Sequence, residues 1–187
     1  MNPASRPART RGIAGSIAVA LACVVPPIRP AHADTVYQEP EAFIAEALGA
    51  VPKPDLVWLT PALQQRVAAV LGHPYRQARL RYWQAGPTQV WILDEIGKEF
   101  PITAGFVVRA ARIATARVLV YRESRGGEIH QKGFVRQFEG AGLGAGGRLD
   151  TRIDGITGAT MSVDAMQRMA QVALLLSTEV AKSEGAK

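Results

Sequence analysis

Seven consecutive residues near the C-terminal end of the chain have the types needed to hold a phosphate group. The segment reads Asp154-Gly155-Ile156-Thr157-Gly158-Ala159-Thr160 and directly precedes a stretch with helical periodicity. The start of a helix offers unpaired backbone N–H groups and the positive end of the helix dipole, and both favour a phosphate. Gly155 and Gly158 permit backbone conformations and close approaches that a side chain would block. The residues alone leave two interpretations open: a phosphate site, or a helix start that Thr157 or Thr160 simply caps.

The same segment resembles the D-x-x-[S/T]-G-A-T signature of the FMN-binding domain family, which includes the flavinylated subunits of the Rnf complex and of the sodium-pumping NADH:quinone reductase. Every defining position is matched, by Asp154, Thr157, Gly158, Ala159 and Thr160. The resemblance extends over residues 101–176. It implies that FMN is joined covalently to Thr160 through a phosphoester, and that a periplasmic flavin transferase attaches it.

The resemblance also assigns roles to the other residues of the segment. Thr160 is then the acceptor of the flavin and not a catalytic nucleophile, and Asp154 belongs to the recognised motif. The cofactor-binding residues it implies are Asp154, Gly155, Ile156, Thr157, Gly158, Ala159 and Thr160. The loop Glu123–Glu128 corresponds to a family loop that lies near the flavin ring, although an exposed hairpin turn fits this sequence equally well.

Other candidate motifs are weaker. Residues 142–147 satisfy G-x-G-x-x-G, but no buried parallel strand precedes them and no clear helix follows, so a dinucleotide-binding turn is not indicated and we expect a flexible loop. His73 and His130 are not spaced with carboxylates as a metal site requires. The sequence therefore predicts no metal site and no catalytic residue.

Helices and strands around the motif predict an α+β fold with an antiparallel sheet flanked by helices. Residues 41–48 and 61–71 are expected to be helical, the second with Thr60 as cap, Pro61 in the first turn and Gly72 at its end. Short gaps separate four predicted strands at 79–83, 89–96, 104–109 and 114–123, which favours antiparallel neighbours. A loop-rich stretch, 124–153, precedes a last helix from about Ser162 to Lys182. Its predicted buried face comprises Val163, Met166, Met169, Ala170, Ala173 and Leu176.

The N-terminus has the pattern of a cleaved secretory signal peptide, which predicts a periplasmic protein. Arginines at positions 6, 9 and 11 precede an uncharged apolar run from 12 to 25, and Ala31-His32-Ala33 forms an A-x-A cleavage site. No Arg-Arg pair is present, so general secretion is favoured. Cys23 is the only cysteine, and lipid attachment there is the weaker alternative. Removing these three arginines and Arg29 leaves 18 basic and 16 acidic residues, a net charge of +2, which argues against nucleic-acid binding.

We therefore expect a signal peptide (1–33), a region that packs on the domain (34–98) and an FMN-binding domain (99–187). The strands 79–83 and 91–98 are candidate contacts for a partner. The favoured function is an electron-transfer flavoprotein that takes electrons from a membrane-bound donor and passes them to an extracytoplasmic acceptor. The alternatives are a self-contained flavin reductase of a small substrate and a non-redox phosphate-binding module.

Overall fold

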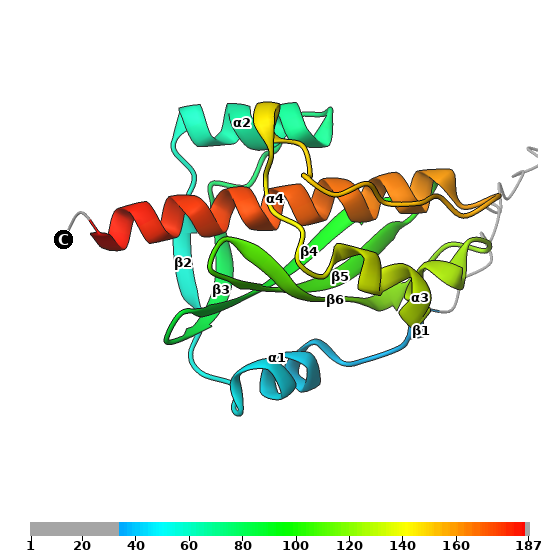
Figure 1. Ribbon diagram of the computed structural model, residues 1–187, viewed down its shortest axis with the longest axis horizontal. Helices are drawn as coiled ribbons and strands as arrows, with labels where there is room; N and C mark the ends of the chain where they lie inside the picture. Colours follow the sequence, from blue (N-terminus) through cyan, green and yellow to red (C-terminus); the bar gives the residue numbers. More distant parts are fainter. Residues whose placement is uncertain (1–33, 186–187) are drawn as a thin grey trace, which may run out of the picture. The chain divides into compact units, whose positions relative to one another are not determined.

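The structure, a computed structural model, describes residues 34–185. These residues fold around one antiparallel sheet (Figure 1). The predicted signal peptide and Cys23 lie outside the described residues. The strand order is β1-β6-β5-β4-β3-β2. The strands are β1 (Thr35–Val36), β2 (Asp55–Trp58), β3 (Arg79–Ala85), β4 (Thr88–Ile96), β5 (Pro101–Arg109) and β6 (Arg112–Tyr121). The helices are α1 (Pro40–Leu48), α2 (Pro61–Leu71), α3 (Lys132–Val135) and α4 (Thr160–Gly185), with short 3₁₀ turns at Gly127–His130, Arg136–Phe138 and Ala145–Gly147. The predicted α+β class is confirmed.

Tight turns join the long central strands. Gly86 has a φ of +54° between β3 and β4, as the first central residue of a type II′ hairpin turn requires. The β5–β6 turn contains Ala110 and Ala111, with φ of +49° and +59°. Both alanines therefore occupy the left-handed region, which glycine and asparagine usually fill. The strands β4, β5 and β6 pair along nearly their whole length and form the centre of the sheet.

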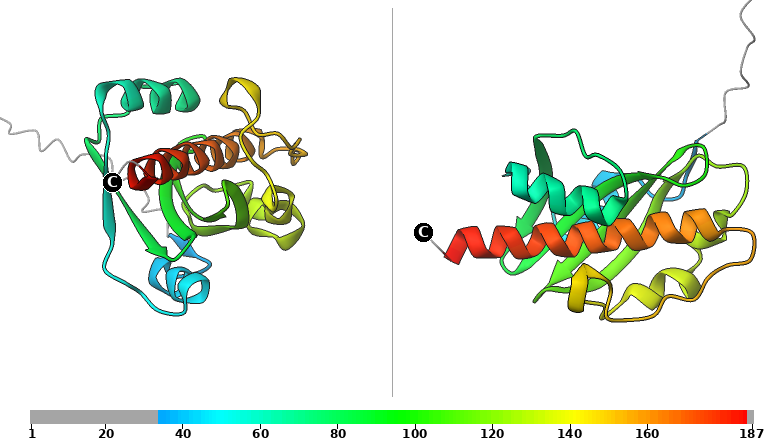
Figure 2. Two further views of the ribbon diagram at one scale, coloured as in Figure 1. Left: turned by 60° about the vertical axis from the view of Figure 1, so that its left-hand side comes forward. Right: turned by 90° about the horizontal axis from the view of Figure 1, so that it is seen from above.

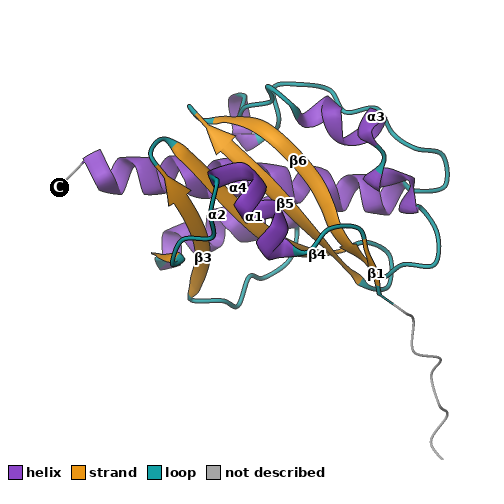
Figure 3. Ribbon diagram, turned by 90° about the horizontal axis from the view of Figure 1, so that it is seen from below, coloured by secondary structure: helices purple, strands orange, loops and turns teal. Residues whose placement is uncertain are grey.

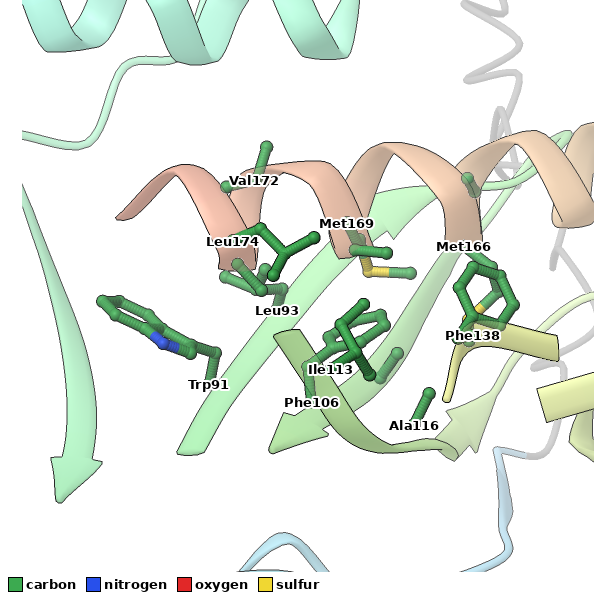
Figure 4. Packing of buried hydrophobic residues seen from close by; sticks show 14 of the residues in the cluster. Trp91, Leu93, Phe106, Ile113, Ala116, Phe138, Met166, Met169, Val172 and Leu174 are labelled. Atoms are coloured by element: carbon green, nitrogen blue, oxygen red, sulfur yellow. The ribbon is translucent and has the colours of Figure 1, made fainter. Parts of the chain in front are cut away.

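Helix α4 covers one face of this centre, with α2 beside it (Figure 2). All six residues predicted for the buried face of α4 are buried. They pack on side chains from β4, β5 and β6, and methionines fill the space between helix and sheet (Figure 4). The labelled residues of this core are Trp91, Leu93, Phe106, Ile113, Ala116, Phe138, Met166, Met169, Val172 and Leu174. Because α4 covers this face of the sheet, α2 packs mainly against α4.

The opposite face of the sheet carries α1 (Figure 3). Phe43 and Ile44 of α1 are buried against Val90, Val107, Leu119 and Val120. Gly105 lies in the middle of β5, and a Cβ there would collide with the ring of Phe43. A glycine inside a strand marks such a close approach, so Gly105 lets α1 lie directly on the strands.

Most predicted elements are confirmed, with shifted ends. Helix α2 has the predicted cap: the Leu63 N–H donates to Thr60 Oγ1 at 3.2 Å, and the left-handed Gly72 ends the helix. The last helix begins at Thr160 and not at Ser162, and it continues to Gly185. β6 lies two residues earlier than predicted. The strands β1 and β2 and the short helices of the 124–153 stretch were not predicted. None of the helices between residues 34 and 185 has the length and apolar character that a membrane crossing needs.

Candidate functional site

The predicted phosphate-binding segment forms a turn that leads directly into α4. The Ala159 N–H donates to the Ile156 carbonyl at 3.0 Å, and Gly158 has a φ of +83°. This backbone conformation explains the glycine at 158. Gly155 has neither a left-handed φ nor an atom within 4 Å of a Cβ built on it, so the described residues give no conformational reason for it. Helical hydrogen bonding then begins with the Val163 N–H, which donates to the Ala159 carbonyl at 2.9 Å.

Both threonine side chains of the segment are exposed. Thr160 is the first residue of α4, and Ala159, in the capping position, has no side-chain acceptor. Within residues 34–185, neither the Thr157 nor the Thr160 hydroxyl makes a hydrogen bond, so the structure does not support the interpretation that these residues only cap the helix. The backbone N–H groups of Thr160, Met161 and Ser162 have no acceptor among the described residues either. The start of α4 therefore presents the Thr160 hydroxyl together with three backbone N–H groups, all without a hydrogen-bond partner among the described residues.

A loop after β6 fixes the position of this turn. Ala159 is buried against Gly126, where a Cβ would lie 3.0 Å from the Ala159 Cβ. The Tyr121 hydroxyl donates to the Arg125 carbonyl at 2.5 Å and lies 3.1 Å from Ser162 Oγ in the first turn of α4. Since its proton goes to the carbonyl, the Ser162 hydroxyl is the donor in the second bond. Burial raises the pKa of Tyr121 above its ordinary value, so the phenol keeps this proton at neutral pH.

An open cavity of about 560 Å³ lies between this loop and the turn. The segment 124–128, Thr157 and Gly158 form part of its wall, and the rings of Tyr37 and His130 form another part. The structure therefore brings the Glu123–Glu128 loop to the motif, in line with the family resemblance. Glu123 itself turns away from the cavity, since its Oε1 accepts the N–H groups of Lys98, Glu99 and Phe100 in the β4–β5 turn.

The acidic residue of the motif is separate from the cavity. The Asp154 side chain is 78% exposed and lies 3.7 Å from Arg152 Nε, whose side chain is also exposed, so this ion pair contributes little to stability. The Asp154 backbone N–H donates to Gln137 Oε1 at 2.7 Å. Ile156 is half-buried and packs against the main core. Ile156 therefore anchors the turn, while the Asp154 carboxylate is left accessible to another molecule.

Sequence reasoning missed four residues at this site: Tyr37, Tyr121, His130 and Ser162. Tyr37 lies more than a hundred positions before the motif, and no periodicity connects the two. The only available signal was the serine two residues into α4, which the structure places against Tyr121.

The other predicted candidates do not join the site. The glycine-rich stretch 142–147 is closed by hydrogen bonds: Asp150 Oδ1 accepts the Gly142 N–H at 2.8 Å, and the Gly144 N–H donates to Arg148. The expected flexible loop is therefore a loop held by specific contacts, because Asp150 also pairs with Arg112 at 3.1 Å.

His73 contacts a carboxylate from a distant strand. Its Nε2 lies 3.2 Å from the buried Glu95, which Arg168 approaches at 3.1 Å. These three side chains link the segment after α2 with β4 and α4. In the described part of the chain, no cluster of three or more histidine, cysteine, aspartate or glutamate side chains could hold a metal ion.

A comparison with known protein families matches the part of the chain that contains the 124–128 loop and the 154–160 turn. Residues 97–175 match the model of the FMN-binding domain family. No curated protein and no solved structure matches the chain. The matched region begins in the β4–β5 turn, includes β5, β6, the 124–128 loop and the 154–160 turn, and ends within α4. The resemblance to the FMN-binding domain family is therefore confirmed for residues 97–175.

Proposed function

We propose that this protein is exported to the periplasm, carries FMN on Thr160 through a phosphoester, and transfers electrons between a membrane-bound reductase and an extracytoplasmic acceptor. The observation that carries the proposal is the exposed, unbonded hydroxyl of Thr160 at the start of α4, next to an open cavity. This arrangement fits the phosphate end of FMN, since α4 provides free N–H donors there and no acidic side chain in its first turn.

Attachment requires an accessible acceptor. The Thr160 oxygen bonds to the phosphorus of a flavin nucleotide while the bond from phosphorus to its leaving group breaks, and the hydroxyl proton is released. Because the side chains of Thr160 and Asp154 are both exposed, a flavin transferase can contact acceptor and motif together. The phosphoester that results keeps a negative charge, which the helix dipole and the N–H groups of Met161 and Ser162 stabilise.

A covalent tether suits an exported protein. Free FMN is scarce outside the cytoplasm, and a tether keeps the local concentration of the flavin high and prevents its loss by dilution. When bound, FMN supplies the redox chemistry, and the chain supplies the tether, the orientation and the exposure of the ring. All strand pairs between residues 34 and 185 are antiparallel, so this part of the chain has no Rossmann-type nicotinamide site. Electrons are therefore expected to arrive from another protein.

Intact-protein mass spectrometry tests the attachment. The full chain is produced with an active flavin transferase and purified from the exported fraction, together with Thr160→Val and Thr151→Val. Thr151 is also exposed but lies before the motif, so its variant is the matched control. We expect a mass increase of FMN less one water in the unaltered protein and in the control, and none in Thr160→Val. An unmodified mass in all three proteins, with the transferase active on another substrate, would sink the covalent proposal.

A second experiment separates a carrier from a self-contained reductase. The flavinylated protein is given a chemical reductant and a small acceptor, either a quinone, a ferric chelate or an organic acid. A carrier is expected to turn these over no faster than an equal concentration of free FMN. Turnover well above that rate would favour the self-contained reductase.

A further inference from the structure

An aromatic pair lies at the cavity beside the motif. The rings of Tyr37 and His130 are stacked, with centroids 4.0 Å apart and planes inclined by 10°. His130 belongs to the matched domain, whereas Tyr37 lies sixty residues before its first position. Both rings line the 560 Å³ cavity together with Thr157 and Gly158.

Tyr37 is held from three sides. Its backbone N–H donates to the Leu119 carbonyl of β6 at 2.8 Å, which fixes the main chain just after β1. Its ring stacks on His130. Its hydroxyl lies over Gly127, where a Cβ would come within 3.1 Å of the phenol oxygen. Burial and then the negative charge of Glu128 raise the pKa of Tyr37 above its ordinary value, so the ring is neutral at neutral pH.

His130 is held by the same loop. It ends the 3₁₀ turn Gly127–His130, and its Nδ1 contacts the Gly127 carbonyl oxygen. Gly127 therefore lies between the two rings and the buried Tyr121, whose ring would be 3.7 Å from a Cβ at this position. The aromatic pair and the attachment turn therefore both contact one loop, 124–128.

We infer that Tyr37 and His130 form the wall against which the isoalloxazine ring of the tethered flavin lies, so that a residue outside the FMN-binding domain completes its cofactor site. The inference rests on the proposed function. A planar aromatic ring gains about 0.5–1.5 kcal/mol from a well-placed aromatic neighbour beyond the area it buries. The wall would thus hold the ring docked on the protein and shield it from solvent, while the phosphoester alone keeps the flavin attached.

This division gives two separate readouts. The intact mass reports attachment at Thr160. The quenching of flavin fluorescence by iodide reports how much of the ring solvent can reach. Replacing Tyr37 by Leu removes the aromatic contact. The equilibrium constant for docking of the flavin ring on the protein should therefore fall by about two- to tenfold. The flavin mass should be retained, and the iodide quenching constant should rise.

Control variants make the result specific. Tyr37→Phe keeps the ring and should restore the low iodide quenching. Trp58→Leu removes an aromatic side chain that is 64% exposed and does not line this cavity, and it should leave the quenching unchanged. His130→Gln tests the second ring of the wall and, like Tyr37→Leu, should raise the quenching.

The outcomes are distinguishable. Normal flavin mass with unchanged iodide quenching in both Tyr37→Leu and His130→Gln would overturn the inference and leave the proposed function intact. Absence of the flavin mass from the unaltered protein would overturn the proposed function, and the inference with it. Unfolding midpoints of both variants are compared with those of the unaltered protein, and if Tyr37→Leu does not fold, His130→Gln and Tyr37→Phe carry the test.

Discussion

At the scale of single residues, the site depends on the contact between two small residues, Gly126 and Ala159. Gly126 has a φ of +83° and lies directly against Ala159 of the motif. Tyr121 stabilises the same contact, because its hydroxyl forms hydrogen bonds with both the loop and the first turn of α4. Any larger residue at 126 must push the loop away from the motif, and the cavity between them would change its shape.

We therefore predict that Gly126→Ala destabilises the protein and reduces flavin attachment. The new methyl group would lie 3.0 Å from both Ala159 Cβ and the Tyr121 hydroxyl oxygen, and the left-handed backbone would strain any L-residue. The free energy of unfolding should fall by about 1–3 kcal/mol in urea titrations. Gly133→Ala is the control, because no atom lies within 4 Å of its Cβ and its φ is not left-handed. Equal stability of the two variants would contradict the account of Gly126.

At the scale of elements, the sequence was informative wherever local chemistry decides the structure. Thr60, Pro61 and Gly72 define the ends of α2 because each satisfies or terminates backbone hydrogen bonding locally. The β5–β6 turn was not predicted as a two-residue hairpin, because Ala110-Ala111 carries none of the usual turn residues. The pairing of the long flanking strands imposes that turn on the two alanines. β2 was missed for a related reason: its four residues form a strand only because β3 lies beside them.

This turn provides a stabilising prediction. Both alanines have a positive φ, which costs an L-residue roughly 1–2 kcal/mol in the left-handed region. Replacing Ala110 by Asn and Ala111 by Gly should therefore raise the free energy of unfolding by about 1 kcal/mol. The measurement is the urea midpoint of the double variant, with flavin attachment unchanged. A midpoint at or below that of the unaltered protein would show that the turn is not strained.

At the scale of the whole molecule, the contiguous part of the site could be predicted and the assembled part could not. The seven motif residues lie together in sequence, so the resemblance proposes all of them at once as cofactor-binding residues. The wall of the cavity unites Tyr37, the loop after β6 and the start of α4, which only the folded sheet brings together. The position of Tyr37 follows from the pairing of β1 with β6, and a two-residue strand carries no sequence periodicity.

Export is a second property of the whole chain that can be tested. Cleavage after Ala33 should give a protein that begins at Asp34, and the intact mass from the periplasmic fraction measures this directly. Asp34, the first residue that the structure describes, accepts a hydrogen bond from Arg122 Nε at 2.9 Å. Replacing Ala31 and Ala33 by Asp should abolish cleavage. A mature protein that begins at a lipid-modified Cys23 would instead identify a lipoprotein.

The stability of the whole molecule should also depend on three carboxylates, Glu123, Asp150 and Glu179, each of which joins two segments of the fold. Burial opposes ionisation of Glu123, but the N–H groups of Phe100, Glu99 and Lys98 hold its pKa below the ordinary value. The Gly142 N–H and Arg112 lower the pKa of Asp150, and Arg66 lowers that of Glu179. Because the unfolded chain binds these protons at higher pH than the folded chain, protonation favours unfolding. The free energy of unfolding should be constant near neutral pH and fall as the pH drops below about 4.5, the ordinary value for a glutamate.

Glu123→Gln isolates one of these contributions. The amide oxygen still faces the three N–H groups but without charge, so the variant should be about 1 kcal/mol less stable at pH 7. The difference between the two proteins should shrink as the pH falls below 4.5, and the two unfolding curves should converge once the pH has passed the lowered pKa of the folded Glu123 carboxyl. Glu99→Gln is the matched control in the same turn, since its side chain is 63% exposed, and its stability should stay within about 0.5 kcal/mol at every pH. A difference between the Glu123→Gln variant and the unaltered protein that does not shrink as the pH falls below 4.5 would show that the turn depends on the shape of Glu123 and not on its charge.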